Sequence, residues 1–230
     1  MLTLAFDTSF KTAAVAILDD ETVLYDVLIN SGLNHSETLL VAMDQAFKQL
    51  RLNINDIDLF ACALGPGSFT GLRVGISTLK GILLACAKPA VGVSSLAAVA
   101  LNITDNNALI YSIMDASRGQ VYTASYRYNN NLLLQVSPEK VVEPDEIVFD
   151  SACGNIILVG GGAIKYREIF RQKVEIAQIA PAREQFIHAS AVGILGREKF
   201  LRKELLDPVA FTPVYLRAAD AKPGKRLFET

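Results

Sequence analysis

Two aspartates that each follow an apolar run are the residues of this sequence best suited to hold a metal ion. Asp7 follows the run 2–6, and Asp115 follows the run 108–114. In phosphate-transferring enzymes such an aspartate positions a hydrated Mg²⁺, and the turn after it holds phosphates through backbone N–H groups. The turn after Asp7 is Phe10-Lys11-Thr12, and it has no glycine to let a phosphate approach the backbone. The residues therefore favour a structural role for Asp7, in ending its strand, over a magnesium site.

A glycine-rich loop is the second candidate for chemistry. It has the sequence Gly65-Pro-Gly-Ser-Phe-Thr-Gly71 and lies between an apolar strand at 59–64 and a predicted helix at 70–88. Such a loop could offer backbone donors and a helix N-terminus to an anion, with contacts from Ser68, Thr70 and Arg73. It is not a Walker A loop, because no Gly-Lys-Ser/Thr follows at the required spacing.

A packing role for the same loop is the alternative that we favour. The glycines would allow a tight turn between strand and helix, and Thr70 would cap the helix. Small residues then recur along one stripe of the helix, which would let another helix approach closely: Gly71, Gly75, Thr78, Ile82 and Ala85. The stripe predicts a contact surface for a partner.

The remaining motifs do not assemble a catalytic set. His35 and His188 are the only histidines, and the position one helical turn after His35 is Leu39, so we expect no metal site. No Gly-x-Ser-x-Gly elbow is present, and no cysteine has an activating neighbour. The run Gly160-Gly161-Gly162 resembles a turn that packs against adenosine in some kinases, and Gly161 is kept as a possible nucleotide contact.

Composition and charge predict a soluble cytoplasmic protein. The chain has 230 residues, half of them hydrophobic, with a formal net charge of −2. Domains that wrap nucleic acid by themselves are usually strongly basic, so any such role would be shared. Three cysteines in apolar surroundings favour reduced thiols, and we find no signal peptide and no apolar run of membrane-spanning length. A basic tail could contact RNA or a partner: Arg217, Lys222, Lys225 and Arg226.

The order of predicted elements indicates an internal duplication. Strands at 2–6, 13–18 and 23–29 are followed by a helix at 35–51, which Asn34 and Glu37 would begin as a capping box. The second half repeats strand, aspartate and hairpin from residue 108 onward, followed by predicted helices at 163–172 and 186–205. This favours an α/β fold of two actin-like, ribonuclease-H-like lobes at 1–103 and 104–230, with the last segment able to pack back on the first lobe.

Several segments resemble the TsaB (YeaZ) family of tRNA threonylcarbamoyladenosine biosynthesis proteins. They are Phe6-Asp7-Thr8-Ser9, Asn34-His35-Ser36-Glu37, Pro213-Val-Tyr-Leu-Arg217 and above all the loop and helix start from Gly65 to Gly75. The resemblance implies a non-catalytic subunit that dimerises with and activates the transferase TsaD. Its further partners would be the ATPase TsaE and, indirectly, tRNA and the TsaC product threonylcarbamoyl-AMP.

The resemblance also implies a structural mechanism. The helices at 35–51 and 70–88 would pack against the equivalent pair of TsaD, or against a second copy when TsaD is absent. The expected interface residues are His35, Leu39, Leu40, Met43, Phe47, Gly71, Val74, Gly75, Ser77, Thr78 and Gly81. We expect no cofactor of its own, with ATP or ADP possible at the partner interface. The alternative is an enzyme: an actin-like small-molecule kinase that uses Asp7, Asp115 and the glycines at 160–162, or a peptidase-like protein.

Overall fold

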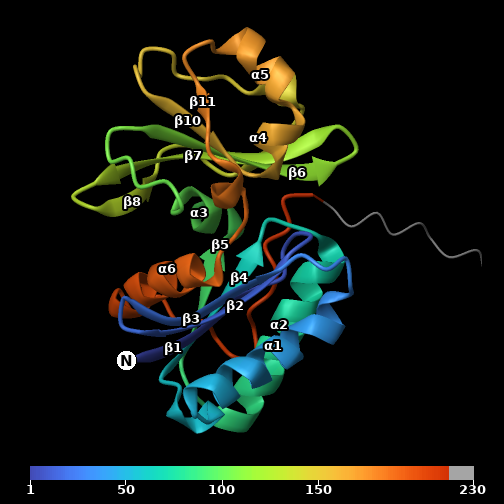
Figure 1. The fold of residues 1–230 in the computed structure, drawn as a ribbon, viewed down its shortest axis with the longest axis vertical. Coiled ribbons are helices and arrows are strands. Elements are labelled where there is room, and N and C mark those ends of the chain that lie inside the picture. The colour runs from blue at the N-terminus through green and yellow to red at the C-terminus, as the bar shows by residue number, and fades with distance from the viewer. Residues whose placement is uncertain (218–230) are drawn as a thin grey trace, which may run out of the picture.

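The first lobe is built on a five-stranded sheet in the order β3-β2-β1-β4-β5. The computed structural model describes residues 1–217 of the chain (Figure 1). In this sheet β1 runs antiparallel to β2 and parallel to β4, and β4 runs parallel to β5. The strands are β1 Leu2–Asp7, β2 Ala13–Asp19, β3 Thr22–Ile29, β4 Leu59–Gly65 and β5 Ala90–Ser94.

The second lobe repeats this sheet strand for strand. Its order is β8-β7-β6-β10-β11, with β6 antiparallel to β7 and parallel to β10. The strands are β6 Leu109–Ser117, β7 Gln120–Asn129, β8 Leu132–Gln135, β10 Ile156–Val159 and β11 Gln178–Ile179, while β9, Lys140–Val142, also pairs with β7. Equal order and equal directions confirm the predicted duplicated, actin-like α/β fold.

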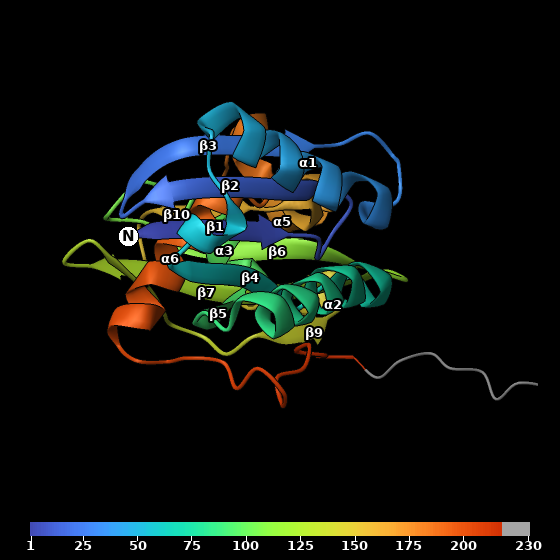
Figure 2. The same ribbon diagram turned by 90° about the horizontal axis from the view of Figure 1, so that it is seen from below.

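The helices cover the sheets and fill the space between them. Helices α1 and α2 pack on one face of the first sheet and α6 packs on the other, while α4 and α5 lie on the second lobe (Figures 1 and 2). Short α3 lies between the lobes and contacts both β4 and β6. Their bounds are α1 His35–Leu50, α2 Phe69–Cys86, α3 Ser95–Ala100, α4 Gly161–Lys165, α5 Arg167–Lys173 and α6 Ala189–Leu201, with short turns η1 Ile54–Asp56, η2 Pro144–Glu146 and η3 Ala182–Gln185.

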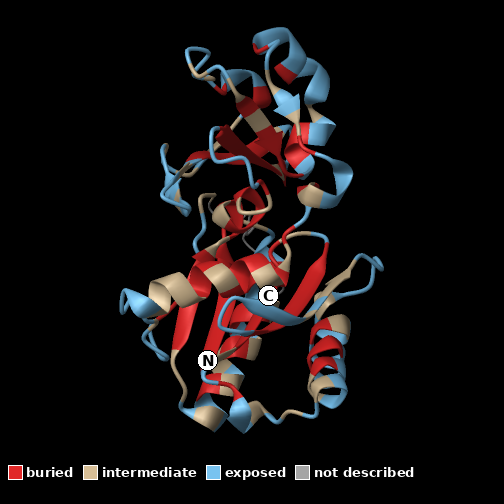
Figure 3. Ribbon diagram, turned by 60° about the vertical axis from the view of Figure 1, so that its left-hand side comes forward, coloured by how far each residue is buried: buried red, intermediate tan, exposed pale blue. Residues whose placement is uncertain are grey.

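One hydrophobic core runs through both lobes. It joins Ala5 and Leu18 of the first sheet to Ile110 and Tyr126 of the second through Leu96 of α3. Figure 3 shows buried residues continuing from the strands of one lobe toward the other. The lobes therefore share apolar contacts that neither could bury alone.

The end of the described chain returns to the first lobe. Helix α6 contacts β1, β2 and β4, so a helix from late in the sequence covers the first sheet. After it, the backbone N–H of Leu206 donates to the Ala90 carbonyl at 2.8 Å, and that of Val214 donates to the Leu64 carbonyl at 2.8 Å. Figure 2 shows this segment running beside β4 and β5.

Some helix ends differ from those predicted. Ser68, not Thr70, caps α2, because its side chain accepts from the Gly71 N–H at 3.3 Å. Asn34 precedes α1 as predicted, but its side chain donates to Glu37 at 2.8 Å instead of capping the helix. The helix predicted over 163–172 is two helices, since the backbone of Tyr166 leaves helical geometry. The helix predicted over 186–205 is shorter at both ends: Phe186 and His188 are extended, and α6 ends at Leu201.

Helix α2 corrects the expectation that no segment reaches membrane-spanning length. It has 18 residues and a mean hydropathy of 1.3, so by length and composition alone it could cross a membrane. Its buried residues include Leu72, Ile76, Leu79 and Leu83, of which the last three join the core between the first sheet and α1. This packing explains the apolar residues of the buried third of α2.

Candidate functional site

The glycine-rich loop packs against the turn that follows β1. A Cβ atom on Gly67 or Gly71 would collide with the backbone carbonyl of Ser9 or Thr8, respectively. Thr8 Oγ1 also donates to the Gly71 carbonyl at 2.7 Å, and the Ser68 N–H donates to the Ser9 carbonyl at 2.6 Å. The glycines are therefore required for close backbone contact inside the lobe.

This contact corrects the interpretation of the small-residue stripe. Gly71 and Gly75 are buried, and a Cβ on Gly75 would lie 2.7 Å from Thr8 Oγ1. Leu39 and Met43 of α1 are 0% and 4% exposed, because they pack toward the first sheet. These four residues support the helices from within, whereas Gly81, the third glycine of the predicted surface, is exposed.

Asp7 is enclosed at the end of β1. Its Oδ1 accepts from the backbone N–H of Ser9 at 3.0 Å and from the Ser9 hydroxyl at 2.5 Å, while its buried Oδ2 has no hydrogen-bond partner among the described residues. Burial raises the pKa of this carboxyl from 3.8 to about 6, against the lowering effect of the bonds from Ser9. Asp7 does not line the cleft between the lobes, where a magnesium nucleotide would have to bind.

Asp115 occupies the corresponding position in the second lobe. Its Oδ1 accepts from the backbone N–H of Ser117 at 3.0 Å, the same distance as in the pair Asp7 and Ser9. Unlike Asp7, it is partly exposed, and both of its oxygens accept from Lys165 Nζ at 3.0 and 2.9 Å. The local geometry is duplicated, but the charge of Asp115 is already neutralised by a cation of the same chain.

The glycine run after β10 contacts the chain itself. The Gly160 N–H donates to Gln185 Oε1 at 2.6 Å, and a Cβ on Gly160 or Gly162 would press on the Ile113 carbonyl. Gln185 is 2% exposed and ends η3, a turn that the sequence did not single out. Gly161 does line the cleft. Gly160 and Gly162 thus serve close packing between α4 and β6.

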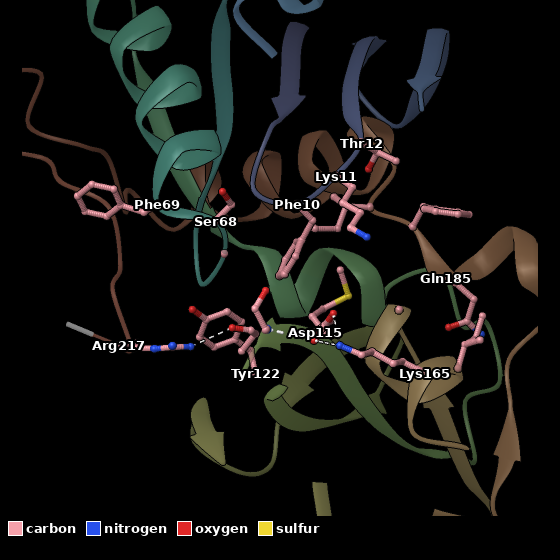
Figure 4. A pocket seen from close by; sticks show the side chains of 18 of the residues that line it. Phe10, Lys11, Thr12, Ser68, Phe69, Asp115, Tyr122, Lys165, Gln185 and Arg217 are labelled. Carbon is pink, nitrogen blue, oxygen red and sulfur yellow. Dashed lines mark hydrogen bonds and ion pairs between the residues drawn. The ribbon is translucent and has the colours of Figure 1, made fainter. Parts of the chain in front are cut away.

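A cleft of about 1070 Å³ separates the two lobes on the side of these turns. From the first lobe it is lined by Phe10, Lys11, Ser68 and Phe69, and Tyr122 and Lys165 face it from the second (Figure 4). The rings of Phe10 and Tyr122 meet edge to face across the lobes, with centroids 6.4 Å apart. Among the described residues, no group of three or more His, Cys, Asp or Glu side chains could hold a metal ion.

A second, smaller groove of about 500 Å³ lies between α1 and α2. Leu39 lies buried at this groove, and Leu40, 58% exposed, and Val74 present their side chains to it. Ser77 and Thr78 also line it, so five of the eleven predicted interface residues belong to this groove. Of the others, Phe47 packs partly against the core, while Gly81 has open space around its Cα.

The predicted anion contacts do not converge on one site. Ser68 and Gly161 line the cleft, whereas Thr70 and Arg73 line the groove between the helices, and Asp7 lines neither. The Arg73 guanidinium lies 3.8 Å above the Phe69 ring, which also contacts Tyr215 at 5.1 Å between centroids. His35 lines the cleft, and its Nε2 donates to the Phe10 carbonyl at 2.7 Å. Phe69 therefore lines both the cleft between the lobes and the groove between α1 and α2.

Comparison with known proteins shows the family to which this chain belongs. A family model described as TsaD, tRNA N6-adenosine threonylcarbamoyltransferase, matches residues 30–225. The tRNA threonylcarbamoyladenosine biosynthesis protein TsaB of Bacillus subtilis is 31% identical to the chain, over 96% of this chain and 96% of that protein. The chain belongs to the TsaB family.

This TsaB-family chain is also similar to a solved structure and, over part of its length, to a transferase. The solved structure of YeaZ from Pseudomonas aeruginosa matches with a TM-score of 0.82 and 25% identity, and covers 94% of this chain and 99% of that one. The tRNA N6-adenosine threonylcarbamoyltransferase of Thermosipho melanesiensis is 32% identical over 41% of this chain and 34% of its own length. The likeness to the transferase therefore covers only part of each chain.

Proposed function

We propose that this chain acts in tRNA threonylcarbamoyladenosine biosynthesis as a non-catalytic subunit that docks on the transferase TsaD through α1 and α2. The observation that carries the proposal is the apolar groove between these helices, with Leu40 more than half exposed beside Val74. Exposed apolar surface of this kind marks interaction sites. A helix pair of similar shape would place its own apolar residues in the groove.

The contacts made by the two aspartates favour an accessory role over a kinase activity. A kinase needs carboxylates that hold Mg²⁺ against the transferring phosphate. Asp7 is buried with its Oδ1 bonded to Ser9, and Asp115 is paired with Lys165. Neither carboxylate is available to a metal ion in the cleft, so we place catalysis in the partner.

The groove between α1 and α2 also predicts how the complex assembles. TsaD fills the groove in the working complex, and a second copy of the chain fills it when TsaD is absent, because the same patch is then left in water. TsaE and tRNA join through the complex, and ATP or ADP would bind at the shared interface and not in this chain alone. The compartment of the proposed complex is the cytoplasm.

Replacing an apolar residue of the groove by a charged one tests the proposed docking on TsaD. Leu40→Asp should abolish co-purification with tagged TsaD and reduce tRNA modification in a reconstituted reaction by at least about tenfold, because an unpaired carboxylate would be buried in the contact. Size-exclusion chromatography of the variant alone should show a monomer.

The matched control is Val148→Asp, which makes the same change at a residue of the second lobe that is 80% exposed. It should leave TsaD binding and modification unchanged. Unchanged TsaD binding by the Leu40→Asp protein would refute the docking surface, and turnover of ATP by the isolated chain would favour the kinase alternative.

A further inference from the structure

The groove between α1 and α2 contains one charged side chain, that of Arg73. The other residues that line it are apolar or carry a hydroxyl group. Arg73 is exposed, and within residues 1–217 its guanidinium forms no ion pair with a carboxylate. A partner that covers the groove would take this cation out of water, which is costly unless the partner supplies an opposite charge.

Stacking on Phe69 holds the guanidinium in a defined place. It lies 3.8 Å above the centre of the Phe69 ring, and that ring in turn contacts the ring of Tyr215. The segment that carries Tyr215 is fixed to β4, because the Val214 N–H donates to the Leu64 carbonyl at 2.8 Å. A stacked guanidinium keeps its N–H donors in the plane of the group, where they match the two oxygens of a carboxylate.

A second copy of the chain has no uncommitted carboxylate on these helices to offer. Helix α2 contains no acidic residue, and α1 contains two. Asp44 is paired with Lys48 at 2.6 Å, and Glu37 accepts from Asn34 Nδ2 at 2.8 Å. The first turn of α2 also lacks an acidic residue, so the positive end of its helix dipole adds to the charge of Arg73.

We propose that Arg73 selects the occupant of the groove, which is a helix of TsaD that carries an aspartate or glutamate paired with this guanidinium. In a symmetric contact between two copies, the same unpaired cation would be covered on both sides. Arg73 therefore favours the complex with TsaD over the homodimer. This inference rests on the proposed function, which names TsaD, and adds the chemical group that TsaD must present.

The test compares two affinities of the full chain: for TsaD, by calorimetric titration, and for itself, by analytical ultracentrifugation. Arg73→Gln removes the charge and keeps a planar end group over Phe69. It should weaken TsaD binding by at least about tenfold and reduce the salt dependence of that binding, because one charge pair is lost. Its self-association should be at least as tight as that of the parent.

Charge reversal identifies the acidic group on TsaD. Arg73→Glu should weaken TsaD binding on the order of a hundredfold or more, because two like charges would then face each other in the contact. A panel of TsaD variants, each with one Asp or Glu of its docking helices changed to Lys, should contain one that restores binding to Arg73→Glu. The same TsaD variant should bind the parent chain poorly.

The matched control is Arg183→Gln, the same change at a side chain of the second lobe that is 83% exposed and lines neither the groove nor the cleft. It should bind TsaD as the parent does. Unchanged TsaD binding by Arg73→Gln, equal weakening of TsaD binding and self-association, or failure of every TsaD variant to restore binding would overturn the selection by Arg73. The docking surface itself is judged separately, by whether the parent binds TsaD and Leu40→Asp does not.

Discussion

At the scale of single residues, Asp7 shows how a catalytic-looking aspartate is used for structure. Its side chain is fully buried, one oxygen accepts hydrogen bonds from Ser9, and the other has no partner within residues 1–217. Burial disfavours the charged form, which is why its pKa rises to about 6. Its counterpart Asp115 is partly exposed and paired with Lys165, so equivalent positions have different charge environments.

The raised pKa gives a prediction for stability. Because folding raises the pKa of Asp7 from 3.8 to about 6, the folded state holds this proton more tightly, and the free energy of unfolding should fall as pH rises from about 4 to about 6. Asp7→Asn should remove that fall and raise the free energy of unfolding at neutral pH by up to about 3 kcal/mol. Urea unfolding followed by circular dichroism across this range measures both effects.

Asn keeps an acceptor oxygen for the two bonds from Ser9, which isolates the effect of charge. A less stable Asn variant at neutral pH would mean that the folded protein stabilises the carboxylate, and would contradict the assignment of burial as the main cause.

At the scale of elements, α2 has two different faces. One carries Gly71 and Gly75 against the turn after β1, and the adjacent one carries Val74 and Ser77 toward the groove, with Thr78 at the boundary of the two and also lining the groove. The first face sets how closely the helix approaches β1, and the second presents the surface proposed for TsaD. A substitution on the first face would therefore shift the residues of the second face.

The glycines of α2 give a prediction with a control on the same helix. Gly71→Ala should lower the free energy of unfolding by about 1–3 kcal/mol, because its methyl group would collide with the Thr8 carbonyl. Gly81→Ala should instead raise it by up to about 1 kcal/mol, since no atom lies within 4 Å of the added Cβ and alanine favours helix. Thermal and urea unfolding compare the two variants. Equal effects would contradict the close packing of Gly71.

At the scale of the whole molecule, α3 ties the lobes together through contacts with β4 and β5 of the first sheet and β6 and β7 of the second. Leu96 of α3 is fully buried in the core that contains strands of both sheets. Ser94, which caps α3, donates to Glu139 of the second lobe, and Tyr126 donates to the same carboxylate at 3.4 Å. Burial raises the pKa of Glu139, while these bonds oppose the rise. Apolar contacts of α3 and polar contacts of Ser94 and Tyr126 with Glu139 thus connect the two lobes.

This shared core predicts that the lobes unfold together. Calorimetry of the full chain should give one transition, with the calorimetric and van't Hoff enthalpies equal. Leu96→Ala should lower the free energy of unfolding by about 2–5 kcal/mol without splitting the transition, because the cavity would lie in a core that both lobes use. Two separate transitions in either protein would contradict the coupling.

By itself, the sequence determined the fold class and most elements. The alternation of apolar runs, the repeated Asp-x-Ser and the hairpins predicted the duplicated sheets, because strand patterns and turn residues act locally. The family resemblance rested on the loop from Gly65 to Gly75, which is contiguous. Two members of the groove, the exposed Leu40 and the half-buried Val74, also followed from helical spacing.

Only the tertiary structure decided which side of each element faces inward. Spacing groups Gly71 with Gly75 and Leu39 with Met43, but it does not say that the turn after β1 and the first sheet cover them. Gln185, distant in sequence, reaches Gly160, and Tyr215 reaches Phe69. The cleft between the lobes likewise combines residues from the turn after β1, α4 and the end of the described chain; of the predicted basic tail, Lys222, Lys225 and Arg226 lie outside the described residues. Such groupings depend on contacts between distant segments, which local patterns do not encode.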